Sequence, residues 1–376
     1  MKFTVLNGDL LNALKRVAAT VESRNTIPIL ANVLLDARDD KLRIRATDLD
    51  IVVETTIPVD VSKPGTITVG ANLLRGVASK LPKSGSATIS LDDAMLAVQS
   101  GRSRFKLQTL PAEDFPSFDA TKSNHSFELS SDDITELLGR SKFAMGTDAT
   151  RYYLNGVFLQ NFNGTLRGVA TDGRRLAMVD RPAPDGAKGF TDDNNSKNTV
   201  GGGIIIPSKT VERITELAAN AAKIAIEISP SRISASDAST TIMSKLIDGT
   251  FPDYVRVIPQ GDGKVIRADR VELQNAIDRV NAVQGKGGRA IQLNISEGKV
   301  EISASNPEAG SAEEDVEVEY GADPITVGFN GQYLNTLLEN ITTDMVDLII
   351  IDPGSPMVAR GVGDDAASFI LMPMRV

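Results

Sequence analysis

The chain of 376 residues contains no cysteine and a single histidine. Without cysteine it can form no disulfide, no thiolate metal site and no cysteine nucleophile. The one histidine, His125, lies in a segment that we interpret as an interdomain linker, where a solvated side chain is expected rather than a catalytic base. No Walker loop, zinc-ligand spacing or nucleophile elbow is found. The sequence therefore predicts no catalytic site, no metal and no cofactor.

Long apolar runs are also missing. No run approaches the roughly 20 residues that span a bilayer, and the N-terminus reads as a strand rather than a signal peptide. Hydrophobic residues make up 41% of the chain and charged residues 24%, which is typical of a globular protein. We expect a cytoplasmic protein of two or three domains, because the chain is too long for one ordinary core.

Net positive charge is absent as well. The formal net charge is −9 and the pI is about 4.9, which as an average argues against nucleic-acid binding, since phosphate contacts need lysine and arginine. An average does not exclude a protein that surrounds DNA, because only its inner wall must be positive. The distribution of charge therefore matters more than its sum.

What the sequence does contain is an internal repeat. Ile67–Gly70 recurs unchanged as Ile325–Gly328, and Ile204–Pro207 lies near the middle position of a repeat of roughly 130 residues. A second marker, at the end of a predicted strand, agrees with the first: Thr47-Asp48, Thr171-Asp172 and Ser305-Asn306. The spacing predicts three copies of one unit.

Each copy shows the same order of elements. A first helix with a one-sided apolar stripe begins near Leu10, Ser131 and Asp269, and a second follows near Asn72–Leu81, Ser208–Ala219 and Asn330–Ile341. Short alternating strands fill the rest and predict an antiparallel α+β domain. We place the domains at residues 1–120, 126–253 and 254–376, and interpret Pro182–Gly203 as a long exposed loop inside the second.

Several motifs, in order along the chain, closely resemble the bacterial sliding clamp family, the beta subunit of DNA polymerase III. They are Arg24–Leu30 (RNTIPIL), Ala46–Asp50 (ATDLD), Arg104–Phe115 (RFKLQTLPAEDF), Arg151–Gly156 (RYYLNG), Ala170–Leu176 (ATDGRRL), Phe251–Tyr254 (FPDY) and Met372–Arg375 (MPMR). The resemblance covers the chain from end to end.

This resemblance implies a DNA-clamp fold of three repeated antiparallel domains, with two chains joined head to tail as a ring. It implies sequence-independent binding of duplex DNA and a non-catalytic role that tethers polymerases and confers processivity. The implied partners are the alpha subunit of DNA polymerase III, clamp-loader subunits, and other polymerases and repair proteins that carry short clamp-binding peptides. The implied location is the cytoplasm, at the nucleoid and replisome.

The resemblance further implies a partner-peptide pocket with an apolar interior and a polar rim. Its expected members are Arg151, Tyr153, Leu154, Thr171, Gly173, Arg174, Arg175, Leu176, Pro252, Arg256, Val257, Asn330, Tyr333, Ile370, Met372, Pro373, Met374 and Arg375. Read without the family, the apolar members are more typical of plain core. Arg174 stands where the family often has histidine, and Asp352–Pro356 does not match the family closely.

Contacts with DNA are expected from cations and tyrosines on the inner helices and adjoining loops. The set implied is Arg24, Lys80, Lys83, Arg140, Tyr152, Tyr153, Lys209 and Arg213, with Lys15, Arg16, Arg75, Lys142, Arg270 and Arg279 as further candidates. Each lysine or arginine could equally be an ordinary solvated residue. Because Asn330–Ile341 contains neither lysine nor arginine, the third domain is expected to hold DNA less firmly.

The same resemblance places the dimer interface between the first domain of one chain and the third domain of the other. Phe105 and Leu107 are expected to pack against Ala282 and Val283, near a glycine-rich stretch at Lys286–Gly288 that we expect to be mobile. Arg102, Arg104 and Lys106 share one face of a strand, and the acidic run Glu313–Glu319 could complement them.

Two other classes of function stay open from the residues alone. Asp48 and Asp172 could suggest a metal-dependent nuclease, although a turn-forming role at equivalent repeat positions is simpler. A repeat-built adaptor that binds proteins and no DNA is the other alternative.

Overall fold

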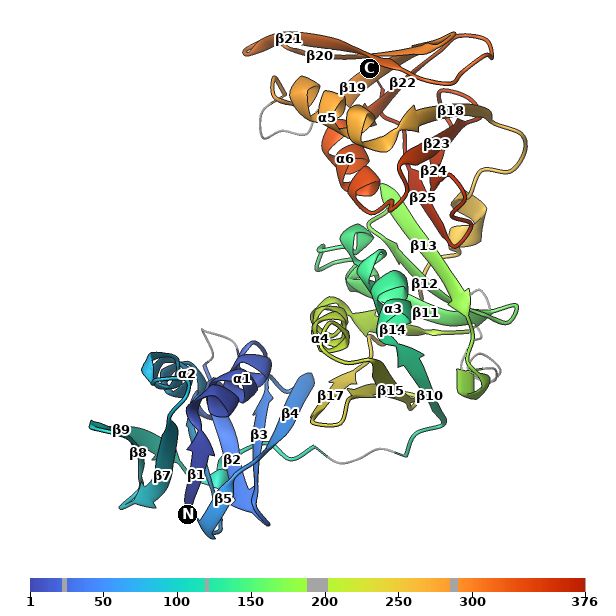
Figure 1. Cartoon of the computed structure of the whole chain (residues 1–376). Helices are drawn as coiled ribbons and strands as arrows, with labels where there is room; N and C mark the ends of the chain where they lie inside the picture. Colours follow the sequence, from blue (N-terminus) through green and yellow to red (C-terminus); the bar gives the residue numbers. More distant parts are fainter. Residues whose placement is uncertain (22–25, 119–121, 188–201, 285–289, 376) are drawn as a thin grey trace. The chain divides into compact units, whose positions relative to one another are not determined.

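The structure of the chain is a computed structural model that describes residues 1–21, 26–118, 122–187, 202–284 and 290–375. It divides into two compact units, the first formed by residues 1–131 and 212–246, the second by residues 132–211 and 247–376. Each unit is described by itself (Figure 1).

The first unit is built on one continuous antiparallel sheet. Its strand order within the described residues is β10-β15-β16-β17-β4-β3-β2-β6-β9-β8-β7-β1-β5. The strands are β1 (Lys2–Leu6), β2 (Asn32–Arg38), β3 (Lys41–Thr47), β4 (Ile51–Pro58), β5 (Asp60–Lys63), β6 (Gly65–Gly70), β7 (Ser86–Asp92), β8 (Met95–Ser100), β9 (Ser103–Leu110), β10 (His125–Ser130), β15 (Lys223–Ile228), β16 (Arg232–Ser236) and β17 (Thr240–Lys245). The pairing of β4 with β17 joins the first and second copies of the repeat in one ladder.

Two helices, α1 (Asn7–Ala18) and α2 (Ala71–Lys80), pack on each other and on this sheet. The apolar stripe predicted for α1 is confirmed, since Leu10, Leu14 and Val17 are fully buried. Each such side chain contributes about 1.5–3 kcal/mol when buried. The opposite side of α1 carries the exposed Lys15 and Arg16.

The second unit contains two sheets. The larger runs β14-β11-β12-β13-β25-β24-β23-β18 and the smaller β21-β20-β19-β22. Their strands are β11 (Gly156–Phe162), β12 (Thr165–Thr171), β13 (Arg175–Pro182), β14 (Ile204–Pro207), β18 (Lys264–Asp269), β19 (Ala290–Ser296), β20 (Lys299–Asn306), β21 (Gly310–Glu317), β22 (Ile325–Asn330), β23 (Met345–Ile350), β24 (Met357–Gly361) and β25 (Ala367–Leu371). The pairing of β13 with β25 joins the second and third copies of the repeat.

The helices of the later copies also fall where the periodicity predicts. They are α3 (Ser131–Ile134), which continues as a π-helical turn over Thr135–Gly139, α4 (Ser208–Ala218), α5 (Arg270–Asn281) and α6 (Gly331–Glu339). The side chains of Asp269 and Asn330 accept hydrogen bonds from the first turns of α5 and α6, which satisfies amide groups that a helix N-terminus leaves unpaired. None of the helices in the described part of the chain has the length and apolar character needed to cross a bilayer.

The turns that mark the repeat have the same geometry in the first two copies. Asp48 Oδ1 accepts hydrogen bonds from the amides of Asp50 (3.0 Å) and Ile51 (2.9 Å). Asp172 Oδ1 accepts them from Arg174 (2.8 Å) and Arg175 (3.0 Å). The turn-forming role predicted for both aspartates is confirmed, and their carboxylates are engaged in holding the backbone.

The prediction that His125 is a solvated linker residue is wrong. His125 is the first residue of β10, is half-buried, and pairs with Ile228 of β15. Because one histidine in a polar stretch gives no periodic signal, its place at a strand start could not be read from the sequence.

The long loop Pro182–Gly203 is described only at its ends, where Pro182, Asp185 and Gly186 are exposed as predicted and Ala187 is not. Asp185–Ala187 forms a 3₁₀ turn, and Ala187 is buried with its carbonyl accepting a hydrogen bond from Asn161 Nδ2 at 2.7 Å. Residues 188–201 lie outside the described residues, as do residues 119–121 of the first predicted boundary.

The second predicted domain boundary is a packed segment. Tyr254 is 1% exposed and lies in a core cluster with Phe158 and Phe251, whose rings stack at 4.8 Å. Its hydroxyl accepts hydrogen bonds from Gln160 Nε2 and from Arg167 Nη1 at 3.5 Å. The boundary between the second and third copies is thus fixed by the buried side chain of Tyr254.

Replacing this residue should destabilise the second unit. We expect Tyr254→Ala to cost about 3–5 kcal/mol through cavity formation, and Tyr254→Phe about 1–3 kcal/mol because Gln160 loses its partner. Urea unfolding followed by circular dichroism measures both. A loss below 1 kcal/mol for Tyr254→Ala would contradict the anchoring role.

Burial also raises the pKa of the Tyr254 phenol, with Arg167 acting in the opposite direction. A raised folded-state pKa means that this stabilisation is complete below the unfolded value of about 10 and is lost as pH rises through the folded value. Stability measured from pH 9 upward should therefore fall more steeply for the native chain than for Tyr254→Phe.

Candidate functional site

The candidate partner surface is built where β13 meets β25. Pairing of Arg175 with Leu371 and of Leu176 with Ile370 brings residues far apart in sequence onto one apolar cluster. Leu154, Leu176 and Ile370 are 4% exposed or less in that cluster. The interpretation as plain core is therefore right for these three residues, which form the floor of the surface.

Met372 and Met374 differ from the floor residues because they are 38% and 40% exposed. The amide of Met372 donates to the carbonyl of Arg174 at 2.9 Å, and the amide of Met374 donates to the carbonyl of Gly328 at 2.8 Å. The backbone of the C-terminal segment is thus fixed while two flexible apolar side chains reach solvent. Adaptable thioether side chains of this kind suit the binding of an apolar peptide anchor.

The basic side of the surface is organised around Tyr333. The Arg175 guanidinium lies over the Tyr333 ring at 4.5 Å, and its Nε donates to Asp172 Oδ2 at 3.1 Å. Arg174 Nη1 donates to the Tyr333 hydroxyl at 3.4 Å. Arg175 is largely enclosed, whereas Arg174 is exposed, so of these two arginines Arg174 is the one that a bound anionic group can reach.

The turn at Gly173 sits against Arg151. Arg151 Nη1 donates to the carbonyl of Asp172 at 3.1 Å. Gly173 has φ +86°, and a Cβ at this position would lie 2.8 Å from Arg151 Nη1. The left-handed backbone is what favours glycine here, because the end of the flexible Arg151 side chain could move away from a Cβ.

Asn330 orients the helix that carries Tyr333. Its Oδ1 accepts a hydrogen bond from the amide of Tyr333 at 3.0 Å and so caps α6. Its place in the partner pocket stays a prediction.

The other expected members take various positions in the second unit. Tyr153 packs on the cluster, and Thr171 Oγ1 bridges the turn by donating to the carbonyl of Arg175 at 2.7 Å. Pro252, Arg256, Val257 and Arg375 are exposed, and Pro373 is half-buried. Arg256 pairs with Asp253 at 2.7 Å.

Sequence reasoning missed three residues of this surface. Val358 and Ile349 belong to or pack on the cluster, and the Phe143 ring lies 5.3 Å below the Arg175 guanidinium. The flanking segment Asp352–Pro356 is a turn in which Asp352 accepts hydrogen bonds from Gly354 and Ser355. The apolar alternation of β23 marks Val346, Leu348 and Ile350 rather than Ile349, and no local pattern marks Phe143.

The candidate DNA-facing residues are distributed unevenly. Lys80, Lys83, Lys142 and Tyr152 are exposed, whereas Tyr153, Lys209 and Arg213 are half-buried. Tyr152 and Tyr153 form an edge-to-face pair with ring centroids 5.8 Å apart, and the Tyr152 hydroxyl donates to the carbonyl of Asp248 at 3.2 Å. Arg24 lies outside the described residues.

Arg140 does not belong in this set. Its side chain is 8% exposed and donates to Glu136 at 2.7 Å, Asp364 at 2.8 Å and the carbonyl of Asn340 at 3.0 Å. Burial opposes its charge, but the hydrogen bonds that it donates to Glu136 and Asp364 leave its pKa raised. A guanidinium neutralised by two carboxylates within the protein has no charge to offer a phosphate.

The candidate interface residues lie on two strand edges. In the described part of the chain β21 pairs only with β20, and the pairing of β9 with β6 is confined to its last two residues. Along β9, Arg104 and Lys106 are exposed and alternate with half-buried Phe105 and buried Leu107, as predicted, while Arg102 lies in the preceding turn.

On the other edge, Ala282 is exposed and Val283 half-buried just after α5, and Lys286–Gly288 lie outside the described residues. Glu314 of β21 accepts hydrogen bonds from Arg279 of α5, which lower the pKa of its carboxyl. The acidic residues of β21 therefore differ in what they can bind. Glu314 is already paired with Arg279, whereas Glu313 and Glu317 are exposed.

Three antiparallel repeats, each with two helices and joined in sequence by the strand pairs β4–β17 and β13–β25, define a DNA clamp of three domains. Models of the DNA polymerase III beta subunit match along the chain, the N-terminal domain at residues 1–119, the central domain at 128–253 and the C-terminal domain at 255–375. The chain belongs to this family, the bacterial beta sliding clamps.

Similar proteins and solved structures support the same family assignment. The beta sliding clamp of Caulobacter vibrioides is 37% identical over 385 residues, and that of Pseudomonas aeruginosa is 37% identical over 380, each match covering 100% of both chains. A crystal structure of the sliding clamp from Bartonella birtlesii, bound to griselimycin, superposes with a TM-score of 0.95 at 37% identity over 100% of both chains. The chain is a DNA sliding clamp, a processivity factor and non-catalytic accessory subunit of DNA polymerase III; the family implies DNA and a polymerase as partners and a homodimer.

The equivalence of the two aspartate turns can be tested by substitution. We expect Asp48→Ala and Asp172→Ala each to lower the free energy of unfolding by about 1–2 kcal/mol, because each frees two backbone amides. Asp48→Asn and Asp172→Asn should cost less, since the amide oxygen still accepts. If denaturant unfolding shows the asparagine variants to be as unstable as the alanine variants, the turn role is wrong.

Proposed function

We propose that two copies of this chain close head to tail into a ring around duplex DNA. In this proposal the domains are residues 1–120, 126–253 and 254–376. The observation that carries it is a mismatch in strand pairing. Two junctions between repeats are made within the chain by β4–β17 and β13–β25. The equivalent strands of a third junction are β21 and β9, and among the described residues β21 and the first six residues of β9 have no partner on their outer edge.

The ladders supply a register for that third junction. Within the chain Thr55 of β4 lies opposite Thr240 of β17, and Val179 of β13 lies opposite Ala367 of β25. The equivalent residues of β21 and β9 are found from the pairing of each strand with its hairpin neighbour, β20 and β8. Glu314 of β21 then corresponds to Thr55, and Ser103 of β9 corresponds to Thr240. The proposed interface therefore sets Glu314 opposite Ser103 of the partner subunit.

This register is favourable in charge. It sets Glu313 opposite Arg104 of the partner subunit and Asp315 opposite Arg102 of the partner subunit, so unlike charges face each other across the new ladder. Phe105 and Leu107 supply its apolar part with Ala282 and Val283, and Lys106 adds a further cation. Pairing the edges also removes two strands that could otherwise template aggregation.

The DNA-facing surface in this proposal consists of the exposed or half-buried cations and tyrosines on and beside the helices. They are Lys80, Lys83, Tyr152, Tyr153, Lys209 and Arg213. Arg24, which lies outside the described residues, is added from the family resemblance alone. Contacts of this kind act on phosphates without reading bases, which is what sliding needs. The net charge of −9 then belongs to the rest of the surface, where it discourages unspecific adhesion.

The partner surface is proposed to take a short peptide with an apolar anchor. The anchor would contact Met372 and Met374 above the floor of Leu154, Leu176 and Ile370, and an acidic group would meet Arg174. The proposed peptides belong to the alpha subunit of DNA polymerase III, to clamp-loader subunits, and to other polymerases and repair proteins. The proposed location is the cytoplasm, at the replisome on the nucleoid.

Retention on circular DNA tests this function. Protein loaded by a clamp loader onto nicked circular plasmid should remain bound through gel filtration and be released when the plasmid is linearised. Equal loss from both forms would contradict a ring and favour a protein adaptor. Magnesium-dependent cleavage of the plasmid that Asp48→Asn abolishes would favour a nuclease instead.

The interface is tested by charge insertion. Phe105→Glu with Leu107→Glu should give monomers in sedimentation velocity at micromolar concentration, because two carboxylates cannot be buried without partners. Val265→Glu, at an exposed site on β18, is the matched control and should leave the dimer unchanged. An unaltered dimer in the double variant refutes the proposed interface.

The partner surface is tested at the C-terminus. Deleting Met372–Val376 should weaken binding of a clamp-binding peptide from the polymerase alpha subunit at least tenfold, equivalent to about 1.4 kcal/mol, and leave sedimentation as a dimer unchanged. The double variant Met372→Ser, Met374→Ser should lose a similar amount, because the anchor contacts side chains rather than backbone. Undiminished peptide affinity measured by fluorescence anisotropy overturns the assignment.

A further inference from the structure

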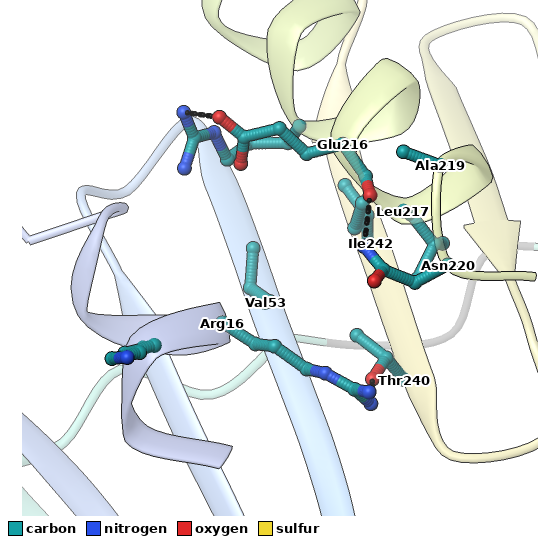
Figure 2. Close-up of a pocket in the computed structure, with 10 residues that line it drawn as sticks. Arg16, Val53, Glu216, Leu217, Ala219, Asn220, Thr240 and Ile242 are labelled. Carbon is teal, nitrogen blue, oxygen red and sulfur yellow. Dashed lines mark hydrogen bonds and ion pairs between the residues drawn. The ribbon is translucent and has the colours of Figure 1, made fainter. Parts of the chain in front are cut away.

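A groove of about 300 Å³ lies in the first unit between α1 and the C-terminal half of α4. Its floor is apolar, with Val53 of β4, Leu217 of α4 and Ile242 of β17 (Figure 2). Arg16 extends across the groove from α1 toward Thr240. The groove has the size of a small-ligand site and is separate from the surface around Met372.

The polar lining of the groove is mostly cationic. Lys15, Arg16 and Arg213 bring three positive charges, and the single carboxylate, Glu216, is already paired with Arg213 Nη2 at 2.7 Å. Arg16 Nη1 donates to Ser239 Oγ at 2.9 Å and to Thr240 Oγ1 at 3.2 Å. These hydroxyl groups fix the direction of the guanidinium without neutralising it.

Arg213 contributes a second, independent observation. Its side chain is 13% exposed, and its Nε is buried without a hydrogen-bond partner among the described residues. A buried donor of this kind normally has a partner. An acceptor in the groove would supply one.

The next repeat junction shows what such an arginine requires. Arg140 occupies the position in α3 and its π-helical turn that Arg16 occupies in α1, since buried Ile134 and Leu138 correspond to buried Leu10 and Leu14. Arg140 has two carboxylate partners, Glu136 one turn earlier and Asp364 of the neighbouring hairpin.

Only one of these two carboxylates has a counterpart near Arg16. The position of Glu136 is taken by Asn12, which is exposed. The position of Asp364 is taken by Asp237, whose Oδ1 accepts hydrogen bonds from the amides of Ser239 and Thr240. Unlike Asp364, Asp237 forms no ion pair with the arginine among the described residues. The position next to the arginine changes from Gly139 to Lys15. The same framework thus lacks one carboxylate and gains one cation at the first junction.

We propose that the groove between α1 and α4 binds a phosphate group, held by Lys15, Arg16 and Arg213, with the sugar of a nucleotide resting on the apolar floor. The phosphate takes the place that carboxylates fill around Arg140. It can come from a free nucleotide or from the backbone of the duplex, and only the second source rests on the proposed function.

The test restores the missing carboxylate. Asn12→Glu places an acid one turn before Arg16, as Glu136 is placed before Arg140, and should form a helical ion pair that keeps the chain folded. Asn12→Gln is the neutral control of equal size. Deoxyadenosine monophosphate and inorganic phosphate are titrated against the DNA-free dimer at low ionic strength and followed by ³¹P NMR line broadening.

For a free nucleotide as source, the native chain and Asn12→Gln should bind the nucleotide saturably and more tightly than inorganic phosphate, and Asn12→Glu should bind it at least tenfold more weakly. Equal affinity for nucleotide and inorganic phosphate overturns the role of the apolar floor. Equal nucleotide affinity in the native chain and Asn12→Glu overturns the site.

A second arm measures affinity for linear duplex against salt. If the duplex is the source, Asn12→Glu should lower the slope of log affinity against log salt by about one per groove engaged, while Asn12→Gln leaves it unchanged. If Asn12→Glu alters neither arm, the inference is wrong. Nucleotide binding by a chain that fails to stay on circular plasmid would instead remove the proposed ring and leave the groove assignment standing.

Discussion

Continuous pairing of strand edges is the constraint on which the rest of this structure depends. Each repeat ends in a strand that the next repeat must pair, and an exposed edge invites the wrong partner. The chain satisfies two such edges internally, through β4–β17 and β13–β25. The open edges of β9 and β21 give a physical reason for two chains to close on each other, because that closure uses a geometry the fold has already built twice. The partner surface around Met372 depends on the same ladders, since β13–β25 pairing assembles its floor.

Much of this architecture could be predicted from sequence because it is periodic. The apolar stripe of Leu10 and Leu14, the alternation of Phe105 and Leu107, and the recurring Thr-Asp turns follow local rules that hold whatever the tertiary context. The roles of Tyr254 and Phe143 could not be predicted, because they depend on which distant strands meet. Arg140 was assigned wrongly for the same reason: its carboxylate partner Asp364 lies in another repeat, and sequence shows the charge of an arginine but not its neutralisation.

The contrast between Arg16 and Arg140 shows how a repeated backbone can carry different electrostatics. At one junction the buried guanidinium of Arg140 is paired with Glu136 and Asp364 and has a structural role. At the other, Ser239 and Thr240 orient the guanidinium, which forms no direct ion pair with a carboxylate among the described residues. A strongly acidic chain can in this way keep local positive charge where a phosphate must be met, since the field at a surface is set by neighbours within about 10 Å rather than by the total.

The ring register is the central claim, and the absence of cysteine from the chain makes it directly measurable. Thr55 Oγ1 and Thr240 Oγ1 lie 3.0 Å apart at the equivalent position within the chain, so side chains at this position meet on one face. A chain carrying Ser103→Cys and Glu314→Cys should, on mild oxidation, run as a covalent dimer in denaturing gels, with neither single variant doing so. Failure of the double variant to cross-link, while it still sediments as a dimer, would contradict the register and the ring closure derived from it.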